Sequence, residues 1–121
     1  MTFADSPTSL AEAHEALTRG AIKVAGATDL MVVDHATLRE HASVLNVLGI
    51  AELQGIRLTP DGLDLGAAST FTRIRQAEEV MRHAPVLVEA ARTIGAAQIQ
   101  NRATLGGNIA NASPAGDSLP A

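Results

Sequence analysis

Two segments of the sequence contain glycines in a pattern suited to binding a ligand. The first covers residues 23–30. Its sequence, Lys-Val-Ala-Gly-Ala-Thr-Asp-Leu, places Gly26 directly after a predicted strand. Because glycine tolerates a sharp backbone turn, successive N–H groups of such a loop can converge on an anion, and a helix beginning near Thr28 would add its positive N-terminal end. The segment matches neither the glycine fingerprint of Rossmann folds nor a phosphate loop. A plain strand-to-helix connection is the alternative interpretation.

The second segment covers residues 101–108, Asn-Arg-Ala-Thr-Leu-Gly-Gly-Asn. The adjacent glycines, Gly106 and Gly107, remove side chains that would block a close approach, while Thr104 and Asn108 offer hydrogen bonds beside them. A loop of this kind suits a pyrophosphate. The same residue types are also typical of a β-bulge or a tight turn, so these positions alone leave both interpretations open.

The other reactive side chains show no comparable pattern. The chain has four histidines, His14, His35, His41 and His83. Their spacing is not that of metal ligands, and surface positions explain them better. Ser113 lacks the context of a nucleophile elbow, which disfavours hydrolase chemistry. We therefore expect neither a catalytic side chain nor a metal site in this chain.

The first glycine segment must be positioned by a small unit of alternating elements. Apolar runs predict strands at residues 21–25 and 44–48, and a short helix beginning at Leu30 joins them, which makes a βαβ-like unit with parallel strands. An amphipathic helix over residues 10–17, with Ser9 as its N-cap and Glu12 three residues later, precedes this unit. We expect this first subdomain to cover residues 1–54.

A second subdomain of mixed α/β structure is expected over residues 55–121. Alternating apolar residues around a Thr-Pro-Asp-Gly turn predict an antiparallel hairpin at residues 56–65. Helices are predicted over residues 70–81 and 85–93, and residues 97–105 are predicted to be extended. Because an isolated hairpin is only marginally stable, we expect the natural domain to continue beyond the chain or to be completed by a second chain.

Composition narrows the classes of partner. The chain has 121 residues, 9 Lys and Arg against 13 Asp and Glu, and a formal net charge of −4, which disfavours nucleic-acid and membrane partners. It has no cysteine, which excludes a disulfide, a thiolate zinc site and an iron–sulfur cluster held within this chain. The sequence shows no secretory signal and no bilayer-spanning run, so we expect a cytoplasmic location.

Residues 104–120 decide between these interpretations. Their sequence is Thr-Leu-Gly-Gly-Asn-Ile-Ala-Asn-Ala-Ser-Pro-Ala-Gly-Asp-Ser-Leu-Pro. It resembles, almost letter for letter, the flavin-binding signature of the medium subunit of molybdenum hydroxylases, a family that includes xanthine dehydrogenases and carbon monoxide dehydrogenases. Residues 24–30, 63–70 and 94–102 are similar to other motifs of the same family. The resemblance implies an α+β fold, a two-subdomain FAD-binding domain of the PCMH (p-cresol methylhydroxylase) type.

The resemblance also implies a binding site for FAD, extended between the subdomains with its pyrophosphate held by main-chain groups of both glycine segments. Asp117 matches an FAD-contacting aspartate, with capping of a helix at Ser118 as the alternative. Ile94 matches a position that packs on the flavin ring, with plain core packing as the alternative. Ala27 replaces a second glycine, which costs roughly 1 kcal/mol or more if its backbone is left-handed. The expected cofactor-binding residues are Lys23, Val24, Ala25, Gly26, Ala27, Thr28, Asp29, Leu30, Ile94, Thr104, Leu105, Gly106, Gly107, Asn108 and Asp117.

By the same resemblance, the chain is one component of a modular oxidoreductase and is inactive alone. Electrons would pass from iron–sulfur clusters in a partner subunit to FAD and on to an acceptor. Molybdopterin and the 2Fe-2S clusters would belong to a molybdopterin subunit and an iron–sulfur subunit. Two alternatives remain: a structural or assembly fragment that does not bind FAD alone, and an unrelated α/β nucleotide-binding protein. The second would be favoured if Gly26 and Gly106 lay far apart.

Overall fold

A three-stranded parallel sheet and one helix form the N-terminal part of the fold. The computed structural model describes residues 3–33 and 43–121. The sheet has the order β1-β3-β2, with β1 spanning Phe3–Asp5, β2 spanning Ile22–Val24 and β3 spanning Ser43–Asn46. The parallel pairing of β2 with β3 confirms the expected βαβ-like unit. Strand β1 adds a parallel partner that the sequence pattern does not predict, because three residues show no measurable alternation.

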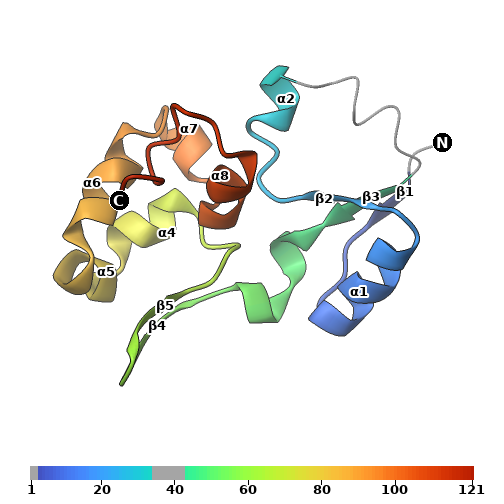
Figure 1. Cartoon of the computed structure of the whole chain (residues 1–121), viewed down its shortest axis with the longest axis horizontal. Coiled ribbons are helices and arrows are strands. Elements are labelled where there is room, and N and C mark those ends of the chain that lie inside the picture. Colours follow the sequence, from blue (N-terminus) through green and yellow to red (C-terminus); the bar gives the residue numbers. More distant parts are fainter. Residues whose placement is uncertain (1–2, 34–42) are drawn as a thin grey trace.

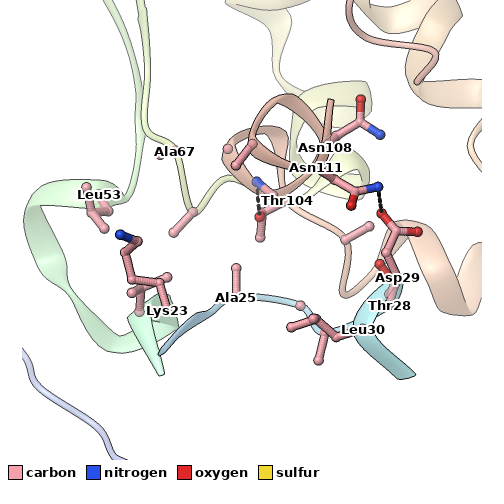
Figure 2. A pocket seen from close by; sticks show the side chains of 18 of the residues that line it. Lys23, Ala25, Thr28, Asp29, Leu30, Leu53, Ala67, Thr104, Asn108 and Asn111 are labelled. Carbon is pink, nitrogen blue, oxygen red and sulfur yellow. Dashed lines mark hydrogen bonds between the residues drawn. The ribbon is translucent and has the colours of Figure 1, made fainter. Parts of the chain in front are cut away.

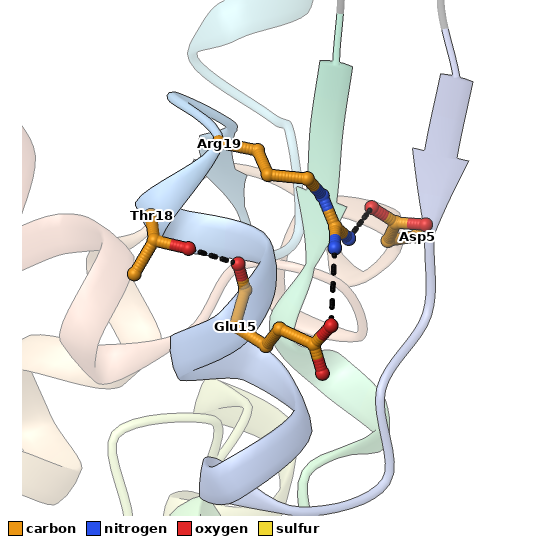
Figure 3. A network of polar contacts seen from close by, with 4 residues as sticks. All are labelled: Asp5, Glu15, Thr18 and Arg19. Carbon is orange, nitrogen blue, oxygen red and sulfur yellow. Dashed lines mark hydrogen bonds and ion pairs between the residues drawn. The ribbon is translucent and has the colours of Figure 1, made fainter.

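Helix α1 (Leu10–Thr18) connects β1 to β2 and packs on the sheet (Figure 1). Ser9 is its N-cap as predicted, since the Ser9 hydroxyl accepts a hydrogen bond from the Glu12 N–H at 3.3 Å. Arg19 follows the helix and forms ion pairs with Asp5 at 3.4 Å and Glu15 at 3.5 Å (Figure 3). These side chains are exposed, so the pairs add little stability.

A loop after β2 leads into the short helix α2 (Leu30–Val33), as predicted. After β3, two single turns of 3-10 helix, η1 (Val47–Gly49) and η2 (Ala51–Leu53), lead to the hairpin. The hairpin strands β4 (Ile56–Thr59) and β5 (Gly62–Leu65) pair antiparallel, which confirms that prediction.

Five short helices complete the chain. They are α4 (Phe71–Gln76), α5 (Glu78–His83), α6 (Pro85–Thr93), α7 (Ala97–Gln100) and α8 (Leu105–Asn111). The prediction for this part differs from the structure in four places, one of which is α8 itself, where the glycine pair suggested a loop.

The first correction is that the predicted helix over residues 70–81 is broken at Ala77, which has an extended backbone with ψ 120°. The second is that residues 97–105 are not extended, because residues of high helix propensity form α7 before the chain turns at Asn101. The third is that no helix begins at Ser118, since residues 117–120 form turns. The capping alternative for Asp117 is therefore wrong.

Two separate hydrophobic clusters hold these parts together. The smaller one joins α1 to β3 and consists of Ala13, Ala16, Leu45 and Ile50. The larger one lies among the C-terminal helices and consists of Phe71, Ile74, Val80, Leu87, Val88, Ala91, Ile94 and Ala103. The clusters fall on either side of residue 54, where the sequence predicts a subdomain boundary, and that boundary stays a prediction. None of the described helices has the length and apolarity needed to span a bilayer.

Two histidines, His14 and His83, are exposed, as expected for surface positions. His35 and His41 lie outside the described residues.

Candidate functional site

A cavity of about 470 Å³ lies between the loop after β2 and the N-terminal end of α8 (Figure 2). Most of the residues predicted to bind a cofactor line it, and they come from both glycine segments. They are Lys23, Ala25, Gly26, Ala27, Thr28, Asp29, Leu30, Ile94, Thr104, Gly106, Gly107 and Asn108. The two segments, which are far apart in the sequence, therefore form one site.

Three of the predicted residues do not line this cavity. Val24 lies between two lining residues on a strand, where successive side chains point to opposite faces. Leu105 packs against the larger hydrophobic cluster. Asp117 is exposed and lies in a separate shallow hollow near Pro114 and Leu119. The structure thus brings the two glycine segments together but leaves Asp117 outside their cavity.

Gly26 allows the first segment to pack directly on the backbone that precedes α8. A Cβ atom at Gly26 would lie 2.0 Å from the Arg102 carbonyl oxygen and 2.6 Å from its carbonyl carbon. No side chain fits at such distances, so glycine is required here by close approach of two backbones. Gly26 therefore fixes how near the two segments can come.

Ala27 turns the first segment through a left-handed backbone conformation, with φ 59°. An L-residue other than glycine pays about 1–2 kcal/mol in this region, because its Cβ approaches a carbonyl oxygen. The loop therefore needs the geometry for which glycine is best suited and adopts it with alanine. The turn ends where Met31 N–H donates to the Ala27 carbonyl at 3.0 Å and α2 begins.

Several main-chain donors of the first segment lack an acceptor among the described residues. The N–H groups of Gly26, Ala27, Thr28 and Asp29 have no hydrogen-bond acceptor among the residues that the structure describes. Adjacent N–H groups at a turn of this kind form a concave site for an anion. The segment can therefore supply several donors to a phosphate group.

The second segment is helical rather than a loop, which corrects the expectation from its glycines. Thr104 is the N-cap of α8, and its hydroxyl accepts a hydrogen bond from Gly107 N–H at 3.1 Å. The N–H of Leu105 donates to the Ser69 carbonyl at 3.0 Å, and that of Gly106 donates to the Ala67 carbonyl at 2.9 Å. These donors are therefore already used within the chain.

Gly106 serves close packing, like Gly26. A Cβ atom at Gly106 would lie 2.8 Å from both the Cβ atom and the carbonyl oxygen of Ala67. At Gly107, a Cβ atom would lie 4.0 Å from the Cβ atom of Ala25 in the first segment. The glycines of α8 therefore allow the helix to pack closely on Ala67 and on the first segment.

The remaining lining residues were not evident from the sequence, because most are apolar residues in unremarkable positions. They are Val47, Leu53, Ala67, Ala68, Ile99, Ala103, Ala110 and Asn111. Tertiary contact brings them to the cavity. Some of them, such as Ala110 and Asn111, lie within segments that resemble the family, but the resemblance did not mark them as cofactor-binding residues. The charged lining residues within the described part of the chain are Lys23 and Asp29, which Figure 2 shows on opposite sides of the cavity.

An α+β domain with a cavity between two glycine segments has the features of a nucleotide-binding domain, and the comparisons with known proteins define it further. The family described as the FAD binding domain in molybdopterin dehydrogenase matches residues 4–121. The chain belongs to this family. An unrelated nucleotide-binding protein would have been favoured if Gly26 and Gly106 lay far apart. Both residues line one cavity, so the structure does not favour that alternative.

Two curated relatives and one solved structure illustrate the similarity. The xanthine dehydrogenase FAD-binding subunit of Escherichia coli O157:H7 is 40% identical over 96 residues, which cover 78% of this chain and 33% of that protein. The caffeine dehydrogenase subunit beta of Pseudomonas sp. (strain CBB1) is 36% identical over 118 residues, which cover 95% of this chain and 40% of that protein. The chain therefore spans between a third and two fifths of these relatives.

The solved structure is a carbon monoxide dehydrogenase from Hydrogenophaga pseudoflava. It superimposes with a TM-score of 0.87 at 30% identity, and the match covers 97% of this chain and 42% of that chain. The expected fold class is thereby confirmed, as is FAD as the cofactor of the family. The relatives are dehydrogenase subunits, consistent with an oxidoreductase component.

Proposed function

We propose that this chain forms the N-terminal portion of the FAD-binding component of a molybdenum-containing hydroxylase or dehydrogenase. The observation that carries the proposal is that the Gly26 and Gly106 segments line one cavity. Among the described residues, the N–H groups of the lining residues 26–29 have no acceptor. The family match over residues 4–121 supports FAD as the occupant.

The first segment is the main phosphate-binding element in this proposal. The N–H groups of residues 26–29 donate to pyrophosphate oxygens, and Lys23, in the middle of β2, contributes a positive charge to the cavity. The second segment contributes differently, since the N–H groups of Gly106 and Gly107 already have acceptors. Gly106 lets α8 pack directly on Ala67, and a Cβ atom at Gly107 would lie 4.0 Å from Ala25 Cβ, so the second segment forms a wall of the site close to the first segment.

The apolar part of the cavity suits the ring system of a flavin. Leu53, Ile94 and Ile99 line the cavity, and Ile94 is 7% exposed at the end of α6. Apolar side chains exclude water from a bound ring and hold its orientation. When bound, FAD supplies the redox chemistry, and the residues of this chain supply binding and orientation.

The names of the relatives support a proposal for the partner subunits of this chain. These relatives are named as an FAD-binding subunit and a subunit beta, which indicates assembly with other subunits. We propose an iron–sulfur subunit and a molybdopterin subunit as partners, with electrons passing from the iron–sulfur clusters to FAD and on to an acceptor. No residue of the cavity is assigned to the oxidised substrate. The subdomain boundary after residue 54 and the cytoplasmic location belong to the same proposal.

A titration of flavins into the purified chain tests the proposal. We expect a saturable change in flavin fluorescence and absorbance with FAD, and much weaker binding of FMN and riboflavin, because these lack the pyrophosphate that residues 26–29 hold. Lys23→Gln should weaken FAD binding about three- to tenfold, in line with loss of one charged contact. Arg57→Gln, which replaces an exposed cation on the hairpin, is the matched control.

No saturable change with FAD would refute binding by this chain and favour a structural or assembly fragment, while leaving its family membership intact. Equal affinity for FAD and riboflavin would contradict the role of residues 26–29.

A further inference from the structure

A hydrogen bond between side chains joins the two segments that line the cavity. The Asn111 amide nitrogen, Nδ2, donates to Asp29 Oδ2 at 3.1 Å, and the residues are 82 positions apart in the chain. Within the described part of the chain it is the one hydrogen bond between the side chains of two cavity-lining residues. Figure 2 shows it on the side of the cavity opposite Lys23.

We propose that Asn111 is a positioning residue that clamps the first glycine segment onto α8 through Asp29, and thereby sets the spacing of the segments that hold FAD. The inference rests on the proposed function, because FAD is the molecule whose fit depends on that spacing. Asn111 does not contact the cofactor in this role. It acts through the loop that Asp29 terminates.

Beyond Ala25, two described contacts join the first segment to the C-terminal part of the chain. At one point, Gly26 packs on the Arg102 backbone. At the other, Asp29 accepts the hydrogen bond from Asn111. The left-handed turn at Ala27 lies between them, and the described residues contain no other hydrogen bond between residues 26–30 and α8. Loss of the second attachment therefore frees the end of the loop that carries the open N–H groups.

The chemistry of the pair favours positioning over direct binding of phosphate. Asp29 is anionic, so direct contact with a pyrophosphate is repulsive. A neutral amide satisfies the carboxylate with a charge-assisted hydrogen bond and adds no further charge. The end of α8 sets the backbone position of Asn111, because Asn111 is the last residue of the helix, and the chain turns away at Ala112 in a left-handed conformation with φ 50°.

The first test removes the donor. Asn111→Leu should weaken FAD binding by the 121-residue chain about three- to tenfold, the range expected for one hydrogen bond to a charged group. Gln98→Leu is the matched control, because it replaces an exposed amide on α7 that does not line the cavity. Unchanged affinity in Asn111→Leu would overturn the proposal.

The second test replaces attraction by repulsion and then restores it. Asn111→Asp places two carboxylates together, so FAD affinity should fall because like charges repel. The double variant Asp29→Asn/Asn111→Asp reverses donor and acceptor and should restore affinity to within about twofold of the original chain. A purely structural role of α8 does not predict this rescue, and its failure would overturn the clamp.

A third measurement needs no cofactor and separates the clamp from the proposed function. Met31 and Ile109 are 55% and 51% exposed, and the chain has no cysteine of its own. Spin labels on the Met31→Cys/Ile109→Cys variant therefore report the distance between the two segments. Addition of Asn111→Leu should broaden the distance distribution. An unchanged distribution overturns the clamp even if FAD binds, whereas broadening without FAD binding supports the clamp and refutes only binding by the isolated chain.

Discussion

Ala27 is the residue at which the first glycine segment stores backbone strain. Its φ is 59°, in the region that glycine occupies at little cost. Ala27→Gly removes about 1–2 kcal/mol of strain but adds entropy to the unfolded chain, so we expect the free energy of unfolding to rise by about 0.5–1 kcal/mol. Urea denaturation followed by circular dichroism measures the change.

Ala25→Gly is the control for this prediction, because it makes the same substitution two positions away without a positive φ to relieve. It should lower the free energy of unfolding by about 0.5–1 kcal/mol. If both variants shifted stability in the same direction, the strain assigned to Ala27 would be contradicted.

At the scale of elements, the start of α8 depends on one buried hydroxyl. Thr104 is 2% exposed, and its hydroxyl accepts the Gly107 N–H. Thr104→Val keeps the shape but leaves that donor unsatisfied, so we expect a loss of about 1–2 kcal/mol in the free energy of unfolding. The Gly107 amide hydrogen should also exchange faster with solvent, which hydrogen-exchange NMR measures.

Thr104→Ser is the matched variant, because it keeps the hydroxyl and loses one methyl group, worth about 0.8 kcal/mol. Gly107 should stay protected in this variant. Equal acceleration of exchange in both variants would show that the cap does not hold the first turn of α8.

The helices and strands also show how much of the fold could be predicted from the sequence. Strong local signals gave correct predictions: Ser9 caps α1, Pro85 begins α6, and the Thr-Pro-Asp-Gly turn joins β4 to β5. The errors fall where tertiary contacts override a local pattern. Ala77 interrupts a helix that the pattern predicts as continuous. The pair of glycines that suggests a loop is helical, because the Ala67 carbonyl accepts the Gly106 N–H and the Thr104 hydroxyl accepts the Gly107 N–H.

Some residues of the candidate site could be predicted from the sequence and others could not. Its glycine segments could be predicted, because Gly26 and the Gly106–Gly107 pair mark positions where backbones approach closely. The role of Asn111 could not, because Asn111 lies within the signature of residues 104–120 but no local pattern shows which residue its side chain contacts. Its partner Asp29 is recognised only when the chain brings α8 beside the first segment.

At the scale of the whole molecule, the cavity lies between two hydrophobic clusters of unequal size. Figure 1 shows the sheet and α1 on one side and the helices α4 to α8 on the other. Links between the sides among the described residues include the Asp29–Asn111 hydrogen bond and two close backbone contacts: a Cβ atom at Gly66 would lie 2.4 Å from the Leu53 carbonyl oxygen, and Gly26 packs on Arg102. A ligand bound in the cavity adds a further connection between the two sides.

This arrangement predicts that FAD stabilises the smaller cluster against local opening. Leu45 is fully buried in the central strand of the sheet, and opening of that strand would disrupt the cavity wall formed by the neighbouring β2 loop. At an FAD concentration 100 times its Kd, the free energy of opening at the Leu45 amide should rise by about 2.7 kcal/mol, because the open state does not bind FAD. Native-state hydrogen exchange measures this rise. The Gly62 amide, at the tip of the hairpin and away from the cavity, should not change, and an equal rise at both amides would mean that FAD does not act through the cavity.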